Sequence, residues 1–235
     1  MCNLVRCAWL GSQRNGIVLW SGDIASTFDS LRKQVKVGLN ISLCGISWWT
    51  TDIGGFVNGN PEDEEFRELL VRWFELGVFC PIFRLHGFRL PVPSRDIFDS
   101  DGYCSSGGPN EVWSFGKKVE DILIRYMEMR EKLRPYVMKQ MEKASQDGTP
   151  VMRPLFYDFS GDEVCYQIED EYLFGPKLLV APVVEKGVTT RKVYLPEGCG
   201  WYSIWDKENI IQGGQWIETL AELDQIPVFV KVNKD

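Results

Sequence analysis

Histidine is nearly absent from this chain of 235 residues, which contains only His86. The seven cysteines are an odd, scattered set without any Cys-x-x-Cys pair. Zinc sites need clustered Cys and His ligands, and a disulfide framework needs paired cysteines. We therefore expect no metal and no cofactor, and we expect reduced thiols in a cytoplasmic protein. The first residues also lack the charged-then-apolar order of a signal peptide.

Long apolar runs and basic runs are missing as well. No stretch approaches the roughly 18 to 20 apolar residues of a membrane helix, so we expect no membrane partner. The 26 Lys and Arg against 33 Asp and Glu give a net charge of −7, without a basic cluster that could neutralise consecutive phosphates. Nucleic acid is therefore not an expected partner.

Aromatic residues, by contrast, are abundant at 13% of the chain, with nine Trp, several of them beside acidic or glycine residues. Such a combination is typical of sugar sites, because C–H faces pack on indole rings while hydroxyl groups need charged partners. The alternative is that most of these Trp lie in the core, which is the usual place for an aromatic side chain.

The first part of the chain alternates between strand-like and helical patterns. Residues 17–20 and 41–49 are short apolar runs that predict strands, and the amphipathic residues 26–38 between them predict a helix. A second unit follows, with an acidic helix start at residues 61–65 and a strand-like VFCPIF at residues 78–83. Repeated units of this kind imply a parallel sheet, either open or closed into a barrel.

The pattern then changes twice. Residues 90–109 are rich in Pro, Gly, Ser and Asp and predict a long loop, and residues 112–143 predict a helix that Pro135 kinks or divides. Short strands separated by turn residues follow, at 151–159, 172–184, 191–196, 200–206 and 226–232. We expect α/β plus β architecture, with one domain at residues 1–147 and an antiparallel β-sandwich at residues 148–235.

Polar residues follow three of the predicted strands. Asp23 follows the first, Asp52 the second, and Arg84 with His86 the third. In a parallel barrel the active site lies at the C-terminal ends of the strands, so these side chains are candidates for a sugar pocket. Two alternatives stay open: Asp23 as the N-cap of the following helix, and His86 as a structural histidine.

Eight segments resemble glycoside hydrolase family 31, in the same order and over essentially the whole chain: RCAWLGSQR, WSGD, GISWWTTDIGGF, RWFELGVFCPIFRLHG, LRPY, GTPVMRPLF, YLFGPKLLVAPV and IPVFV. The resemblance implies the last strands of a (β/α)8 TIM barrel followed by the proximal part of a β-domain. It also implies that Asp23 of WSGD is the general acid/base. Residues that match the family's sugar-binding positions are Arg6, Asp52 and His86, and matches to its aromatic walls are Trp20, Trp49 and Phe56.

The family's catalytic nucleophile is an aspartate on an earlier barrel strand, and no segment of this chain resembles that motif. We therefore expect a fragment of a retaining α-glycosidase that acts on an oligosaccharide or glycoside and is inactive alone. Open sheet edges would then need the missing N-terminal half of the barrel, or a second copy of the chain, as a partner.

The motifs SWWTTDIGGF and FRLHG are similar to those of family members that act on terminal α-xylosides. A bulky wall made by Trp48 and Trp49 would exclude the C6 hydroxymethyl group of glucose. The alternatives are an α-glucosidase of the same family and a non-catalytic sugar-binding module without the nucleophile.

Overall fold

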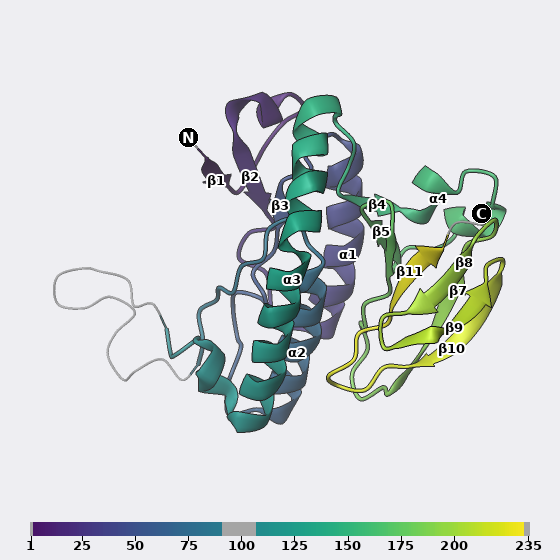
Figure 1. The fold of residues 1–235 in the computed structure, drawn as a ribbon. Coiled ribbons are helices and arrows are strands. Elements are labelled where there is room, and N and C mark those ends of the chain that lie inside the picture. The colour runs from purple at the N-terminus through teal and green to yellow at the C-terminus, as the bar shows by residue number, and fades with distance from the viewer. Residues whose placement is uncertain (1, 91–106, 233–235) are drawn as a thin grey trace, which may run out of the picture.

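Three short parallel strands lie side by side at the start of the chain (Figure 1). The computed structural model describes residues 2–90 and 107–232. Strands β1 (Asn3–Val5), β2 (Ile17–Trp20) and β3 (Trp49–Thr50) form a sheet in that order, with a short 3-10 helix η1 (Ser12–Asn15) between the first two. Past β3, Ile53 forms a parallel bridge with Leu85, so a further segment continues the sheet.

Two helices follow β2 and β3, as the sequence predicts. Helix α1 (Phe28–Leu43) starts at Thr27, whose side chain accepts the backbone N–H of Ser30. Helix α2 (Glu64–Val78) starts at Asp63, which caps it in the same way, and nearly all of its second half is buried. These are βα units, and their helices run back against the direction of the strands.

Two strands predicted in the first part of the chain are wrong. Residues 41–49 are not one strand, because α1 continues to Leu43 with Leu39 and Ser42 on its buried face, and only Trp49–Thr50 is extended. The run VFCPIF is not a strand either, since Val78 is the last residue of α2. A short apolar run has no clear period, so a helix end and a buried strand give the same pattern.

A long helix connects the two parts of the molecule. The 3-10 helix η2 (Val112–Phe115) and Gly116 precede α3 (Lys117–Asp147), so the predicted helix starts five residues later than expected. Helix α3 runs through Pro135 without being divided, and Gly148 ends it in a left-handed conformation. Most of the loop predicted at residues 90–109 lies outside the described residues.

The C-terminal part is a β-sandwich with antiparallel pairing. Its elements are β4 (Met152–Pro154), α4 (Leu155–Asp158), η3 (Glu163–Tyr166), β5 (Tyr172–Phe174), β6 (Leu178–Val180), β7 (Thr190–Leu195), β8 (Gly200–Ser203), β9 (Asp206–Gln212), β10 (Gln215–Leu220) and β11 (Val228–Val232). The larger sheet has the order β4-β5-β6-β11-β8-β9, and β7 pairs with β10. Strands β9 and β10 were not predicted, because most of their side chains are exposed and carry no apolar alternation.

One apolar core joins the barrel part to the sandwich. It contains Leu31, Trp73 and Leu123 from the three long helices, and also Met152 and Tyr172 from the first sandwich strands. A second cluster around Trp201 and Phe229 fills the interior of the sandwich. The two parts are therefore packed on each other through apolar side chains.

A buried charged group lies at the same junction. Arg72 pairs with Glu75 (3.3 Å), whose other oxygen accepts the hydroxyl of Tyr126 (2.7 Å). The guanidinium of Arg72 also donates to backbone carbonyls of the sandwich part, those of Val188, Ala221 and Glu222. Burial raises the pKa of Glu75 to about 7, against the opposing effects of Arg72 and Tyr126.

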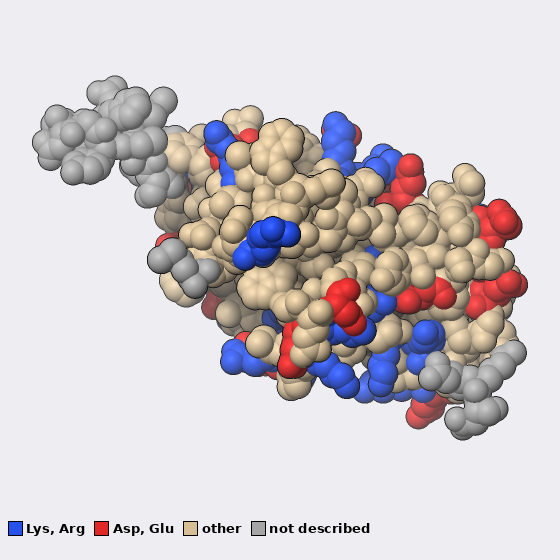
Figure 2. Space-filling model, turned by 90° about the horizontal axis from the view of Figure 1, so that it is seen from above, with Lys and Arg blue, Asp and Glu red and all other residues tan. Residues whose placement is uncertain are grey.

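Charged side chains are unevenly distributed on the face seen from above. Figure 2 shows acidic and basic groups mixed over the sandwich side and broad neutral areas over the helical side of that face. In the part of the chain that the structure describes, no helix has the length and apolar character to cross a bilayer.

Candidate active site

Three loops meet beyond the C-terminal ends of the parallel strands. The carbonyl of Ile24 accepts the backbone N–H groups of Phe56 (2.7 Å) and Val57 (3.2 Å). The carbonyl of Phe56 in turn accepts the N–H of Phe88 (2.7 Å). The loops that carry Asp23, Asp52 and His86 are thus joined by backbone hydrogen bonds, because parallel strands end at the same edge of their sheet.

The close approach of the first two loops depends on Gly55. Its φ of +76° is unfavourable for residues with a side chain, and an added Cβ would lie 2.6 Å from the Cα of Ser26. No side chain fits there without separating the loops. The second glycine of DIGGF is therefore explained by loop contact.

Asp23 is an accessible carboxylate at the edge of this loop cluster. Its Oδ2 lies 3.5 Å from Nη1 of Arg6, and both side chains are about half or more exposed, at 47% and 67%. The alternative role as a helix N-cap is wrong, since Thr27 caps α1. The structure thus leaves Asp23 free to contact a ligand, beside the arginine that was predicted with it.

Asp52 differs from Asp23 because it is completely buried. Its Oδ1 forms an ion pair with Arg84, whereas Oδ2 has no hydrogen-bond partner among the described residues. Burial raises the pKa of the Asp52 carboxyl, and the nearby Arg84 opposes that rise. A buried carboxylate oxygen without a protein donor can accept a hydrogen bond from a water or from a ligand hydroxyl.

His86 stands at the surface of the same cluster. Its ring lies 5.5 Å from the ring of Phe56, centroid to centroid. Partial burial and the Arg84 charge lower the pKa of His86, while the charges of Asp52 and Asp23 raise it. His86 is therefore within electrostatic reach of both carboxylates, and the lowered pKa favours its neutral ring, which donates from one nitrogen and accepts at the other.

The predicted aromatic walls do not all lie here. Trp20 is partly buried at the end of β2, and its indole N–H has no partner in the described part of the chain. Trp49 requires a correction: it is only 1% exposed, its ring packs against Gly38 of α1, and it belongs to the same core cluster as Met152 of β4. Alternation along the strand directs Trp49 into the helix layer, away from the loops.

Trp48, which was predicted to form a wall with Trp49, lines a different space. A cavity of about 590 Å³ lies between Trp48, Phe83 and Met138 of α3. The structure therefore gives neither tryptophan a place against the Asp52 loop. The steric explanation for xylose selection loses its two named residues.

The combined groups suit a polyhydroxylated ring. Asp23 and Asp52 supply oxygen acceptors, Arg6 and His86 supply N–H donors, and Phe56 supplies an apolar face. Carboxylates and guanidinium groups make the strong, directional hydrogen bonds that hydroxyl groups need. Within residues 2–90 and 107–232, no three His, Cys, Asp or Glu side chains are grouped as a metal site would require.

One residue of the cluster was not anticipated. Arg89 is fully buried and donates to the loops that carry Asp52 and His86. No periodicity or strand end marks this position in the sequence. Only the glycines around it, in DIGGF and LHG, are a signal, because they indicate close packing against something.

Two family models match the chain. The model described as "Glycosyl hydrolases family 31 TIM-barrel domain" matches residues 1–140, and "Glycosyl hydrolase family 31 C-terminal domain" matches residues 148–234. The predicted architecture, a partial barrel followed by a β-sandwich, is thereby confirmed.

Individual relatives point the same way. The crystal structure of an α-xylosidase from a soil metagenome, complexed with xylose, is 52% identical, with a TM-score of 0.93 over 98% of this chain and 34% of that one. An α-xylosidase from Saccharolobus solfataricus is 38% identical over 97% of this chain and 29% of its own length. "Alpha-glucosidase 2" from Bacillus thermoamyloliquefaciens is 33% identical over 97% and 26%. The chain thus spans between about a quarter and a third of the length of these relatives.

Proposed function

We propose, from the premise that this chain belongs to glycoside hydrolase family 31, that it supplies the acid/base side of the active site of a retaining α-glycosidase. The proposed substrate is a glycoside with a terminal, non-reducing α-linked xylose. The observation that carries the proposal is the buried Asp52, whose Oδ2 has no hydrogen-bond partner within residues 2–90 and 107–232 and which interacts electrostatically with His86 and the accessible Asp23.

Asp23 is the proposed general acid/base. In the first step it donates its proton to the glycosidic oxygen while a second carboxylate attacks the anomeric carbon. In the second step it accepts a proton from the water that hydrolyses the glycosyl enzyme. Its exposed carboxylate, with Arg6 alongside, suits a group that exchanges protons with a leaving group and with water. The second carboxylate is expected on an earlier barrel strand, as in the family.

Asp52, His86 and Phe56 are the proposed sugar-holding groups. A hydroxyl of the ring would donate to Oδ2 of Asp52, while Arg84 holds the other oxygen and fixes the carboxylate plane. Hydrogen bonds to a charged, buried acceptor strengthen as charge develops on the ring, and they contribute more to the transition state than to substrate binding.

The choice of xylose rests on similarity. Both the structural relative at 52% identity and the Saccharolobus relative at 38% are described as α-xylosidases. The relative described as an α-glucosidase, at 33%, supports the alternative substrate. The wall that would exclude a C6 group is not supplied by Trp49, so another part of the complete enzyme would have to supply it.

The test is an assay of the complete enzyme on matched aryl α-xyloside and α-glucoside. A higher kcat/KM for the xyloside is expected. A higher kcat/KM for the glucoside would instead support an α-glucosidase of the same family. Turnover of neither substrate, with retained binding of xylose, would favour a sugar-binding module. The isolated chain of residues 1–235 is expected to hydrolyse neither, because the glycosyl intermediate needs the second carboxylate. Its cytoplasmic location and its domain limits stay predictions from sequence.

A further inference from the structure

Arg89 holds the two loops that carry the sugar-binding groups. Its Nη1 donates to the carbonyl of Gly55 (2.7 Å), and its Nη2 donates to Ile53 (2.9 Å) and, more weakly, to His86 (3.4 Å). Its Nε donates to the side chain of Asn110 (2.7 Å). One planar guanidinium thus bonds to both loops at once and to a third segment beyond them.

The surroundings of the guanidinium are shaped for it. A Cβ added to Gly54 would lie 2.9 Å from Nη2, one added to Gly59 would lie 2.8 Å from Nη1, and one added to Gly87 would overlap the guanidinium. The ring of Phe66 covers its face at 4.9 Å. Gly87 has no positive φ, so its lack of a side chain is explained by space for Arg89.

We propose that Arg89 is a positioning residue for sugar binding: it fixes Asp52, Phe56 and His86 by bonding to the backbone beside them. Ile53 follows Asp52 directly, Gly55 precedes Phe56, and the third carbonyl belongs to His86 itself. Misplacement of reacting groups by about 1 Å can lower a rate by roughly 10²-fold. The inference rests on the proposed function, because the residues that Arg89 positions are the proposed sugar contacts.

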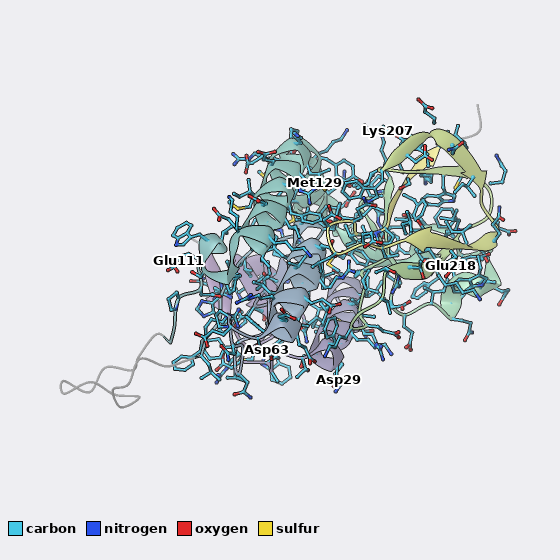
Figure 3. All side chains as sticks on the ribbon, turned by 90° about the horizontal axis from the view of Figure 1, so that it is seen from below. Asp29, Asp63, Glu111, Met129, Lys207 and Glu218 are labelled. Carbon is cyan, nitrogen blue, oxygen red and sulfur yellow. The ribbon has the colours of Figure 1, made fainter. Side chains whose placement is uncertain are left out.

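Arg130 offers a matched control. It too is largely buried and donates to three backbone carbonyls, those of Val78 (2.5 Å), Cys80 (2.8 Å) and Pro81 (2.8 Å). Those carbonyls lie at the C-terminal end of α2. Asp63, labelled in Figure 3, marks the opposite, N-terminal end of this helix. Loss of either arginine leaves several carbonyls without donors, so both changes lower stability through the same mechanism.

The experiment compares Arg89→Lys, Arg89→Ala and Arg130→Ala in the complete enzyme. Each variant is characterised by its Tm, its kcat/KM on an aryl α-xyloside and its Kd for xylose. For the Arg89 variants we expect kcat/KM to fall by roughly 10 to 100-fold and binding of xylose to weaken. For Arg130→Ala we expect a comparable fall in Tm with kcat/KM within about twofold of wild type.

Chemical rescue separates positioning from loss of folding. Guanidinium chloride at tens of millimolar should restore part of the kcat/KM of Arg89→Ala, with sodium chloride as the salt control. It should not change Arg130→Ala. If Arg89→Ala fails to fold, Asn110→Ala gives a milder test, because it removes only the acceptor of Nε. We expect about a threefold loss of kcat/KM there and a smaller fall in Tm than for Arg89→Ala, because only one hydrogen bond is lost.

A double-variant cycle gives a second, independent measurement. Gly87→Ala should displace the guanidinium and lower kcat/KM by about tenfold, and it should cost nothing further in Arg89→Ala. The proposal is overturned if Arg89→Lys and Asn110→Ala keep wild-type kcat/KM and xylose Kd, or if Arg130→Ala loses activity in equal measure. Failure of the proposed function is a different result, in which the wild-type enzyme itself does not hydrolyse the xyloside. In that case, comparing the Kd for xylose of wild type and the Arg89 variants still tests whether Arg89 positions the sugar-binding groups.

Discussion

Two buried carboxylates with arginine partners, Asp52 and Glu75, differ in how many of their oxygens have hydrogen-bond partners. Both oxygens of Glu75 have partners, Tyr126 and Arg72, and the group lies between α2, α3 and the sandwich. One oxygen of Asp52 pairs with Arg84, and the other has no partner in the described residues. The completed group lies at the junction of the two parts, and the incomplete one is the proposed acceptor for a sugar hydroxyl.

The two regions also differ in location. The Glu75 group lies inside the junction, where Arg72 reaches carbonyls on the sandwich side. The Asp52 group lies at strand ends under accessible side chains such as Asp23. In Figure 3, Glu111 at the loop side and Lys207 and Glu218 on the sandwich lie at opposite ends of the molecule, with the junction between them.

The largest expected effect is on stability, at the junction. Arg72→Met leaves Glu75 without its partner and three backbone carbonyls of the sandwich part without their donor, which should lower the free energy of unfolding by about 3 to 5 kcal/mol. Denaturant unfolding of the complete enzyme measures this, and kcat/KM of the folded fraction should be unchanged. A loss of activity at unchanged stability would break the contrast between the two carboxylates.

The next effect concerns pH at the same place. The pKa of Glu75 is raised from 4.5 to about 7 in the folded state, so its stabilising contribution is complete below about pH 4.5 and disappears as pH rises through 7. Relative to Glu75→Gln, the wild type should lose about 3 kcal/mol of stability between pH 4.5 and 8. Tm measured as a function of pH for the wild type and for Glu75→Gln tests this difference. The same dependence of Tm on pH in both proteins would contradict it.

A smaller effect is expected at the site, on catalysis. Asp52→Asn keeps the shape and removes the charge, so kcat/KM on an α-xyloside should fall roughly 10 to 100-fold, about 1.5 to 3 kcal/mol. Tm should stay unchanged or rise, because the substitution removes a buried charge while the amide oxygen can still accept from Arg84. A variant with full activity and lower Tm would place Asp52 in the same class as Glu75.

The smallest effect is expected from the aromatic contact. Phe56→Leu keeps apolar bulk but removes the aromatic ring beside His86 that is proposed to pack on the sugar. If that aromatic contact contributes roughly 1 kcal/mol to binding, the Kd for xylose should rise about fivefold. Titration with xylose measures it. No change in Kd would assign Phe56 to loop packing alone.

The sequence predicted some of these features for clear physical reasons. Strand β2 followed by Asp23, and helix α2 with its acidic start, have clear patterns. Residues 172–184 were predicted as one strand, but they form the hairpin of β5 and β6. Residues 41–49 and VFCPIF were wrong, because short apolar runs fit helix ends equally well. The place of Trp49 depends on which face of a two-residue strand it occupies, and Arg89 acts through backbone carbonyls. Neither leaves a pattern in the sequence.

The role of Asp23 is the central claim, and leaving-group dependence tests it most directly. In the complete enzyme, Asp23→Asn should lower kcat/KM on an alkyl α-xyloside by about 10²- to 10⁴-fold, because that leaving group needs a proton. On α-xylosyl fluoride, whose fluoride leaving group departs without protonation, the loss of kcat/KM should be far smaller. An equal loss on both substrates would contradict a general-acid role for Asp23 and assign it to sugar binding instead.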